Sequence, residues 1–151
     1  YKWADTKKLM TYGMEFYHYQ DVRLPEEFGK ICVEKAVPEN GKLYGTRDVK
    51  LVPERRTAKG VVKQMLQKKS EEKDIEAAVR MLLRDDEKVR METNSEHVLT
   101  APVEKGTAVG TVRIFLENEE IGSCRLVTEK RVQERDFSWC LKKIVEYCFM
   151  I

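Results

Sequence analysis

The sequence has 151 residues, of which 42% are hydrophobic and 36% are charged. Its 28 Lys and Arg residues nearly balance 26 Asp and Glu residues, which leaves a formal net charge of +2. This length allows one domain with a sizeable core, or a smaller domain with an appendage, and excludes a barrel enzyme of about 250 residues. The balanced charge argues against a dedicated nucleic-acid-binding protein, and the apolar content argues against a disordered chain.

The first predicted element is a helix over Asp5–Tyr19, with Asp5 or Thr6 as its cap. Leu9, Tyr12 and Phe16 share one face of it at helical spacing. This face either packs on the protein's own core or belongs to a neighbouring domain outside this chain. Val22–Glu27 contains a proline and is expected to be a linker.

The next segments favour β-structure around a helical insertion. Lys30–Val37 and Leu43–Val52 are rich in β-formers, and the Pro38–Gly41 turn between them suits a tight hairpin. Helical spacing predicts a helix over about Gly60–Ala78. Strands are expected on either side of Asp85-Asp86, in the pattern of a hairpin with an acidic turn.

The last third of the sequence shows the alternation typical of β-strands more clearly than the preceding segments. Val98–Val103, Ala108–Leu116 and Ile121–Val127 read as strands, separated by turns at Glu104–Gly106 and Glu117–Glu120. We therefore expect a mainly β fold: a small antiparallel β-sandwich with a helical insertion near 56–78, an N-terminal helix and a C-terminal amphipathic helix.

The C-terminal segment Asp136–Ile151 is the predicted amphipathic helix, with Asp136 as its cap. Aromatic residues flanked by Lys are typical of a helix that lies in the plane of a membrane interface. The alternative is a helix that packs on the protein's own sheet or on a partner. The residues predicted to contact the membrane are Phe137, Trp139, Leu141, Ile144, Val145, Tyr147, Phe149, Met150 and Ile151.

The four cysteines do not indicate a metal site. None belongs to a Cys-x-x-Cys pair, so neither a structural zinc nor any other cofactor is predicted. Cys140 and Cys148 would lie about 12 Å apart along one helix, too far to form a disulfide. Cys32 and Cys124 could pair only if their strands are neighbours. No run of about 18 apolar residues is present, so no membrane-spanning helix is expected.

The chain carries no convincing catalytic motif. Ser70-Glu71-Glu72-Lys73 matches the Ser-x-x-Lys pattern of penicillin-binding acyl-transferases, but it lies in a charge run with no apolar wall to exclude water. We interpret it as a chance match, and a hydrolase that uses Ser70 is the least favoured hypothesis. No catalytic residue is predicted.

The stretch Leu99–Gly110, with the sequence LTAPVEKGTAVG, resembles the "apv-kG--vG" segment of one protein family. That family is the C-terminal domain of low-molecular-mass penicillin-binding proteins, which are serine-type D-Ala-D-Ala carboxypeptidases of the penicillin-binding protein 5 kind. Val112–Leu116, Ile121-Gly122 and Leu126-Val127 continue the resemblance. Asp136–Ile151 falls where that family has a membrane-anchoring helix, and Asp5–Met14 resembles the last helix of its catalytic domain.

The resemblance implies a non-catalytic accessory domain whose catalytic domain lies upstream. Residues 1–22 would belong to that missing domain, 23–135 would form the β-sandwich, and 136–151 would associate with the membrane. The implied location is the outer face of the bacterial cytoplasmic membrane, with peptidoglycan met only through the catalytic domain. Arg56–Ala78 departs from the family because it is longer and more helical. The competing hypothesis is a stand-alone β-sandwich module that binds a protein or a glycan.

Overall fold

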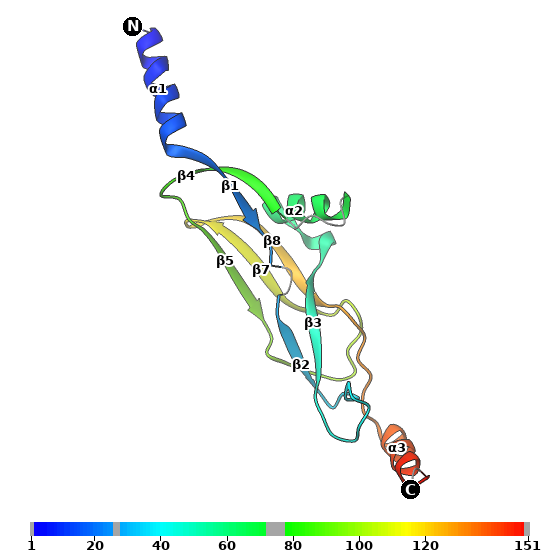
Figure 1. The fold of residues 1–151 in the computed structure, drawn as a ribbon. Helices are drawn as coiled ribbons and strands as arrows, with labels where there is room; N and C mark the ends of the chain where they lie inside the picture. Colours follow the sequence, from blue (N-terminus) through cyan, green and yellow to red (C-terminus); the bar gives the residue numbers. More distant parts are fainter. Residues whose placement is uncertain (1, 26–27, 72–77, 150–151) are drawn as a thin grey trace. The chain divides into compact units, whose positions relative to one another are not determined.

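The computed structural model describes residues 2–25, 28–71 and 78–149. Two compact units make up the chain: one comprises residues 1–26, 58–92 and 113–124, and the other comprises 27–57, 93–112 and 125–151. The fold is mainly β, with a helix near each end and one helix between strands β3 and β4 (Figure 1). The predicted fold class is therefore confirmed.

Six strands form one sheet in the order β5-β7-β8-β3-β2-β6. Neighbouring β2 and β3 are antiparallel, as are β3 and β8, whereas β2 and β6 run parallel. The strands span Lys30–Glu34 (β2), Arg47–Pro53 (β3), Val89–Ser95 (β5), Val98–Thr100 (β6), Ala108–Leu116 (β7) and Glu119–Thr128 (β8). Ile31, Val33, Val49 and Leu51 are buried at alternate positions, as expected for strands with one face on the core.

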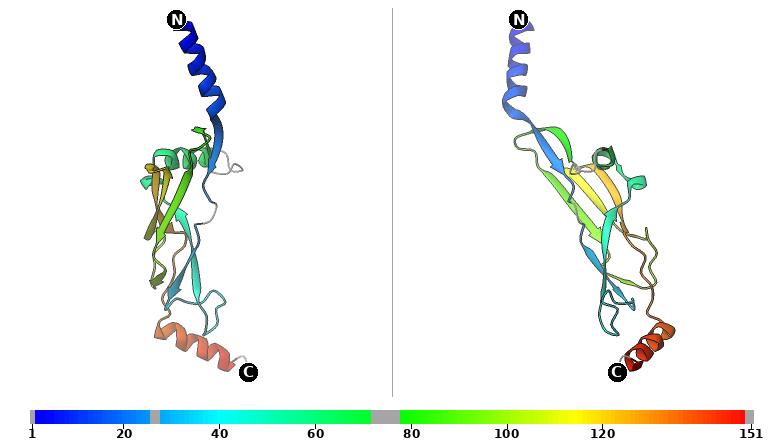
Figure 2. Two further views of the ribbon diagram at one scale, coloured as in Figure 1. Left: turned by 90° about the vertical axis from the view of Figure 1, so that its left-hand side faces the viewer. Right: turned by 45° about the vertical axis from the view of Figure 1, so that its right-hand side comes forward.

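A separate two-stranded ribbon joins the start of the chain to its middle. Helix α1 spans Lys2–Phe16 and continues into β1, Tyr17–Arg23, which pairs antiparallel with β4, Ala78–Arg84 (Figure 2). The expected helix over Asp5–Tyr19 is thus wrong at both ends, because Tyr17–Tyr19 are paired with β4. Thr6 lies inside α1 and donates to the Lys2 carbonyl oxygen at 2.8 Å rather than capping the helix.

The strands on either side of Asp85-Asp86 exist but do not form a hairpin. β4 pairs with β1, and β5 lies beside β7 in the larger sheet. The Asp85 amide donates to the carbonyl oxygen of Phe16 at 3.0 Å, and the Asp85 carboxylate lies 2.8 Å from His18 Nδ1. These contacts hold the acidic turn against the start of β1, so the chain passes from one sheet to the other there.

The Pro38–Gly41 turn is present, but it does not make a tight hairpin. The Gly41 amide donates to the Pro38 carbonyl oxygen at 3.1 Å. β2 ends at Glu34, however, and β3 begins only at Arg47. Lys35 adopts a positive φ of 55°, and Ala36 then forms a bridge with Glu134, so the chain leaves β2 early to pair with a distant segment.

The Leu99–Gly110 motif contains a turn that is hydrogen-bonded to the end of β8. The buried Thr128 hydroxyl donates to the Glu104 carbonyl oxygen at 2.8 Å and accepts from the Thr107 amide at 3.1 Å. The Gly106 amide donates to the Thr128 carbonyl oxygen at 2.9 Å. At Gly110 the backbone of β5 comes so close that an added Cβ would lie 2.2 Å from the Asn94 carbonyl oxygen. Only glycine fits that position without a shift of the strand.

The inserted segment docks on the sheet. It comprises a short 3₁₀-helix, Arg55–Thr57, and helix α2, Gly60–Glu71; the remainder of the predicted helix over 72–77 lies outside the described residues. Gly60 forms a bridge with Gly122 of β8, at a φ of 58° and with no room for a Cβ beside the Ile121 carbonyl oxygen. Val62 and Met65 are fully buried. The apolar face of α2 is therefore part of the core of its own unit.

Replacing Met65 by Ala should destabilise the protein by about 2–5 kcal/mol, because it removes a fully buried side chain and leaves a cavity. Urea denaturation followed by circular dichroism measures the difference. Gln64→Ala, at the adjacent exposed position of α2, is the matched control and should change the free energy of unfolding by less than about 0.5 kcal/mol. Equal effects of the two substitutions would mean that α2 does not pack on the sheet.

Cys32 and Cys124 do not pair. Cys32 lies on β2 and Cys124 on β8, and β3 separates these two strands in the sheet. All four cysteines are free thiols, with Cys124 buried and Cys148 exposed. Burial raises the pKa of the Cys124 thiol from its ordinary value of 9.0 to about 11.

The folded protein should therefore react with iodoacetamide at Cys148 but not at Cys124 at pH 8, as measured by mass spectrometry. Because folding favours the neutral Cys124 thiol, its contribution to stability is complete below pH 9 and is lost as the pH rises through about 11. Urea should make both cysteines reactive. Rapid modification of Cys124 under native conditions would contradict its burial.

Candidate functional site

Helix α3, Phe137–Phe149, is the strongest candidate for a functional surface. The segment that precedes it, residues 132–135, is hydrogen-bonded to other residues of the second unit. Val132 and Val103 exchange backbone hydrogen bonds of 2.8 and 3.0 Å, and the Val37 amide donates to the Gln133 carbonyl oxygen. The Arg135 amide donates to the Lys35 carbonyl oxygen at 2.7 Å, and its guanidinium donates to the Leu43 carbonyl oxygen at 3.0 Å. The chain is thus anchored up to the residue before the helix cap.

Asp136 caps α3, as the sequence predicts. Its carboxylate accepts from the Trp139 amide at 2.8 Å, and its carbonyl oxygen accepts from the Cys140 amide at 3.1 Å. The side-chain contact satisfies one of the unpaired amides at the helix start and places a negative charge at the positive end of the helix dipole. The helix start is therefore determined locally.

The apolar face of α3 is exposed. Phe137 and Phe149 are 81% and 86% exposed, and the aliphatic residues Leu141 and Ile144 are 50% and 48% exposed. No described residue of the helix is buried. Val145 and Tyr147, each 45% exposed, lie on the same broad arc at about 100° per residue. Such a face gains free energy only when something else covers it.

Three residues of α3, namely Trp139, Cys140 and Lys143, are half-buried. Lys143 follows Cys140 by three residues and Trp139 by four, and Tyr147 follows Lys143 by four, so this side of the helix adjoins Tyr147 of the apolar arc. Lys143 also forms an ion pair with Glu146 at 2.6 Å. Among the predicted membrane-contacting residues Trp139 is half-buried, whereas Met150 and Ile151 lie outside the described residues.

Helix α3 has 13 residues and is about 20 Å long. Within the described parts of the chain, no helix combines the length and the apolar content that a bilayer crossing requires. The length and the exposed apolar face instead suit a helix that lies flat on a surface.

Helix α1 also exposes apolar residues on more than one side. Trp3, Met10 and Met14 form one stripe and are 88%, 60% and 74% exposed. Leu9 and Phe16 belong to a second stripe, and no residue of the helix is buried. A helix that is apolar on several sides is usually surrounded by protein.

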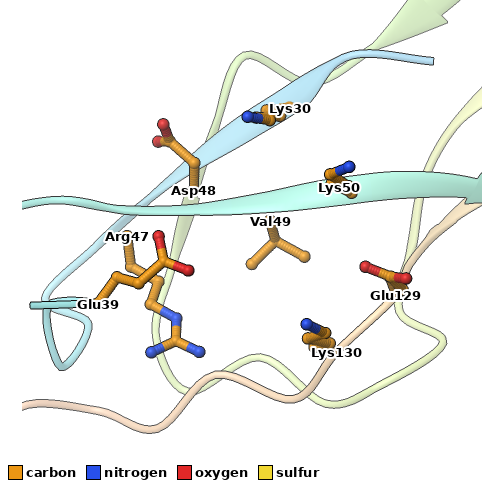
Figure 3. Close-up of a pocket in the computed structure, with 8 residues that line it drawn as sticks. All are labelled: Lys30, Glu39, Arg47, Asp48, Val49, Lys50, Glu129 and Lys130. Carbon is orange, nitrogen blue, oxygen red and sulfur yellow. The ribbon is translucent and has the colours of Figure 1, made fainter. Parts of the chain in front are cut away.

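A pocket of about 160 Å³ lies in the second unit and is lined mainly by charged side chains from β2, β3 and the segment after β8 (Figure 3). Ligand pockets are usually apolar with a few polar groups, whereas here Val49 alone is apolar. No serine, cysteine or histidine is among its lining residues. The lining residues are Lys30, Glu39, Arg47, Asp48, Val49, Lys50, Glu129 and Lys130.

The Ser-x-x-Lys match lies partly outside the described residues. Ser70 belongs to α2, while Lys73 lies outside the described residues. Within 2–25, 28–71 and 78–149, no group of three or more His, Cys, Asp or Glu residues is placed to hold a metal ion. Sequence reasoning found helix α3 and its cap Asp136.

Comparisons with known proteins agree with the resemblance seen in the sequence. No curated protein matches the chain. Among solved structures, penicillin-binding protein 5 from Haemophilus influenzae is 19% identical, over 87% of this chain and 30% of that one, with a TM-score of 0.38. The D-alanyl-D-alanine carboxypeptidase DacD from Francisella tularensis is 16% identical, over 87% of this chain and 26% of that one, with a TM-score of 0.35.

The chain thus spans less than a third of the length of these two proteins. A family model described as "Penicillin-binding protein 5, C-terminal domain" matches residues 28–134, well over half of the sequence. This range includes the Leu99–Gly110 motif and the whole six-stranded sheet. The chain belongs to the penicillin-binding protein 5 C-terminal domain family.

Proposed function

We propose that this chain is the non-catalytic C-terminal accessory part of a serine-type D-Ala-D-Ala carboxypeptidase, and that it holds the catalytic domain at a membrane surface. Membership of a C-terminal domain family supports an accessory role. The exposed apolar face of α3, on a helix whose start is anchored to the domain, is the observation that carries the membrane role.

The energetics of α3 favour an interfacial position. Fully burying a Leu, Ile or Phe side chain contributes about 1.5–3 kcal/mol, so covering the exposed parts of several such residues offsets the cost of immobilising the protein. Lys142 and Lys143 can keep their ammonium groups at the headgroups while the apolar arc enters the acyl boundary. Phe137, Leu141, Ile144, Val145, Tyr147 and Phe149 are the described residues proposed to enter it.

The remaining assignments follow from this role. Residues 1–22 belong to the end of the catalytic domain, residues 23–135 are the spacer, and residues 136–151 are the anchor. The parent enzyme would act on peptidoglycan at the outer face of the cytoplasmic membrane, and the spacer would set its distance from the lipid. The rival hypothesis is a protein- or glycan-binding module whose binding surface is the inserted segment. The apolar residues of α2 in that segment are buried within its own unit, so they are not free to bind a partner.

The double substitution Leu141→Gln and Ile144→Gln should weaken binding to vesicles containing anionic phospholipid by at least about 30-fold. Each side chain is about half exposed, so covering the two contributes about 2 kcal/mol. Vesicle flotation measures the bound fraction. Glu146→Gln is the matched control, because it places the same amide on the opposite face, and it should bind at least as well as the wild type.

Deletion of residues 136–151 removes the whole of α3 and is therefore a stronger test of its proposed membrane binding. It should abolish flotation while leaving the circular dichroism of the β-sheet intact. Unchanged binding after this deletion would show that α3 is not the anchor.

Fluorescent penicillin should label the full-length protein at a serine upstream of this chain and should leave the isolated 151-residue chain unlabelled. Ser-x-x-Lys chemistry requires a water-excluded site, which the charged surroundings of Ser70 do not offer in the sequence. Gel fluorescence and peptide mapping locate the label. Covalent modification of Ser70 would overturn the accessory role, and an unlabelled full-length protein would overturn the carboxypeptidase assignment.

A further inference from the structure

The β1–β4 ribbon has an inner and an outer face. In its register Tyr19 pairs with Leu82 and His18 pairs with Leu83. Alternate residues of a strand point to opposite faces, so Leu82 and Leu83 lie on different sides. Leu83 and Val79 are 1% and 6% exposed and belong to the core, whereas Tyr19 and Leu82 are 70% and 52% exposed. The Tyr19–Leu82 pair is therefore the apolar centre of an uncovered outer face.

This outer face continues into α1 through a chain of aromatic contacts. The rings of Tyr12 and Phe16 are 4.8 Å apart, and those of Tyr12 and Tyr17 are 6.3 Å apart. Tyr17 precedes Tyr19 by two residues, so both lie on the same face of β1. Tyr12 and Phe16 are 47% and 43% exposed, so the apolar surface runs from the helix onto the ribbon.

Charged pairs border the surface. Asp21 and Arg80 form an ion pair at 3.2 Å on the same face of the ribbon, one step beyond Tyr19 and Leu82. At the other end Arg84, opposite Tyr17, forms a two-pronged contact with Asp86 that raises the pKa of Arg84 and lowers the pKa of Asp86. A Tyr- and Leu-rich centre with a charged rim that includes Arg is the usual composition of a protein interface.

The chain order indicates what covers this surface. The matched family region begins at residue 28, so α1 and β1 precede it, whereas Leu82 of β4 lies inside it. Whatever protein precedes α1 in the polypeptide is tethered directly beside the ribbon, and a tether supplies a high effective concentration. We propose that the upstream domain of the same polypeptide, to whose end residues 1–22 belong, packs along Tyr12, Phe16, Tyr17 and Tyr19 and from there docks on Leu82 and Arg84 of β4. This inference rests on the proposed function for the existence of that domain.

Docking on β4 has a structural consequence. The upstream domain would be joined to this chain covalently through α1 and non-covalently through Leu82, which lies about 60 residues later in the sequence. Two attachments restrict rotation at the junction, whereas α1 alone would act as a hinge. The ribbon thus sets the orientation of the upstream domain.

Amide hydrogen exchange on the full-length protein and on the 151-residue chain tests the proposal. We expect the exchange of α1 and of β4, residues 78–84, to slow at least tenfold in the full-length protein. Slowed exchange in α1 with unchanged exchange in β4 would overturn the docking. Protection of β4 that rises with the concentration of the 151-residue chain, or that appears only with vesicles, would show a second copy or a membrane instead, and would also overturn it.

Leu82→Asp separates docking from folding. The 151-residue variant should keep its melting temperature, because Leu82 is already half exposed. In the full-length protein the same change should return the exchange of β4 to the rate of the isolated chain. Gln64→Asp, on the exposed side of α2, adds the same charge and should leave the protection in place; loss of protection in both variants would contradict the proposal. Leu82→Asn serves as a milder change if the aspartate variant misfolds.

The hydrogen-exchange test of docking does not depend on whether the full-length protein binds penicillin. Protection of β4 in a full-length protein that penicillin does not label would retain the docking surface and remove the carboxypeptidase assignment. Penicillin labelling without protection of β4 would retain the assignment and remove the docking surface.

Discussion

The hydrogen bonds along β8 are the constraint on which the fold depends. Its ten residues lie between β7 and β3 in the sheet. Near its start Gly122 meets Gly60 of α2, and at its end Thr128 holds the turn at Glu104–Thr107. Buried backbone groups must find partners, so each neighbour has to keep its register with this strand. The Leu99–Gly110 motif is explained by the same constraint, since it supplies both the turn that reaches Thr128 and the glycine that lets β5 approach β7.

The helices α1, α2 and α3 differ in how far their apolar side chains are buried. Among the helices of the described residues, α2 buries its apolar side chains, because the Gly60–Gly122 approach brings its backbone onto β8 and its side chains into the core. Helices α1 and α3 contain no buried residue, although α3 starts from a firmly hydrogen-bonded segment. Their exposed faces are the basis for two proposed contacts, with the upstream domain through α1 and the β1–β4 ribbon, and with a lipid surface through α3. The domain would thus connect two partners.

Prediction from sequence succeeded where local signals were strong. The alternation over Ala108–Leu116 predicted β7, and Asp136 predicted the start of α3 through its capping chemistry. It failed at Tyr17–Tyr19, where aromatic residues suit a helix and a strand equally and the pairing with β4 decided between them. It also failed at Asp85-Asp86, where acidic turn residues suggested a hairpin although β4 and β5 belong to different sheets. The described candidate residues of α3 are exposed, apart from the half-buried Trp139, and their contact with lipid is a proposal.

The sequence by itself determined the family, the mainly β class and the presence of an amphipathic helix near each end, because these depend on local periodicity and on a contiguous motif. The tertiary structure alone decided that Cys32 and Cys124 are separated by β3 and that α2 of the insertion joins the core. These features depend on pairings between residues far apart in the chain. Local patterns specify which residues are apolar, but only long-range packing decides which of them lose contact with water.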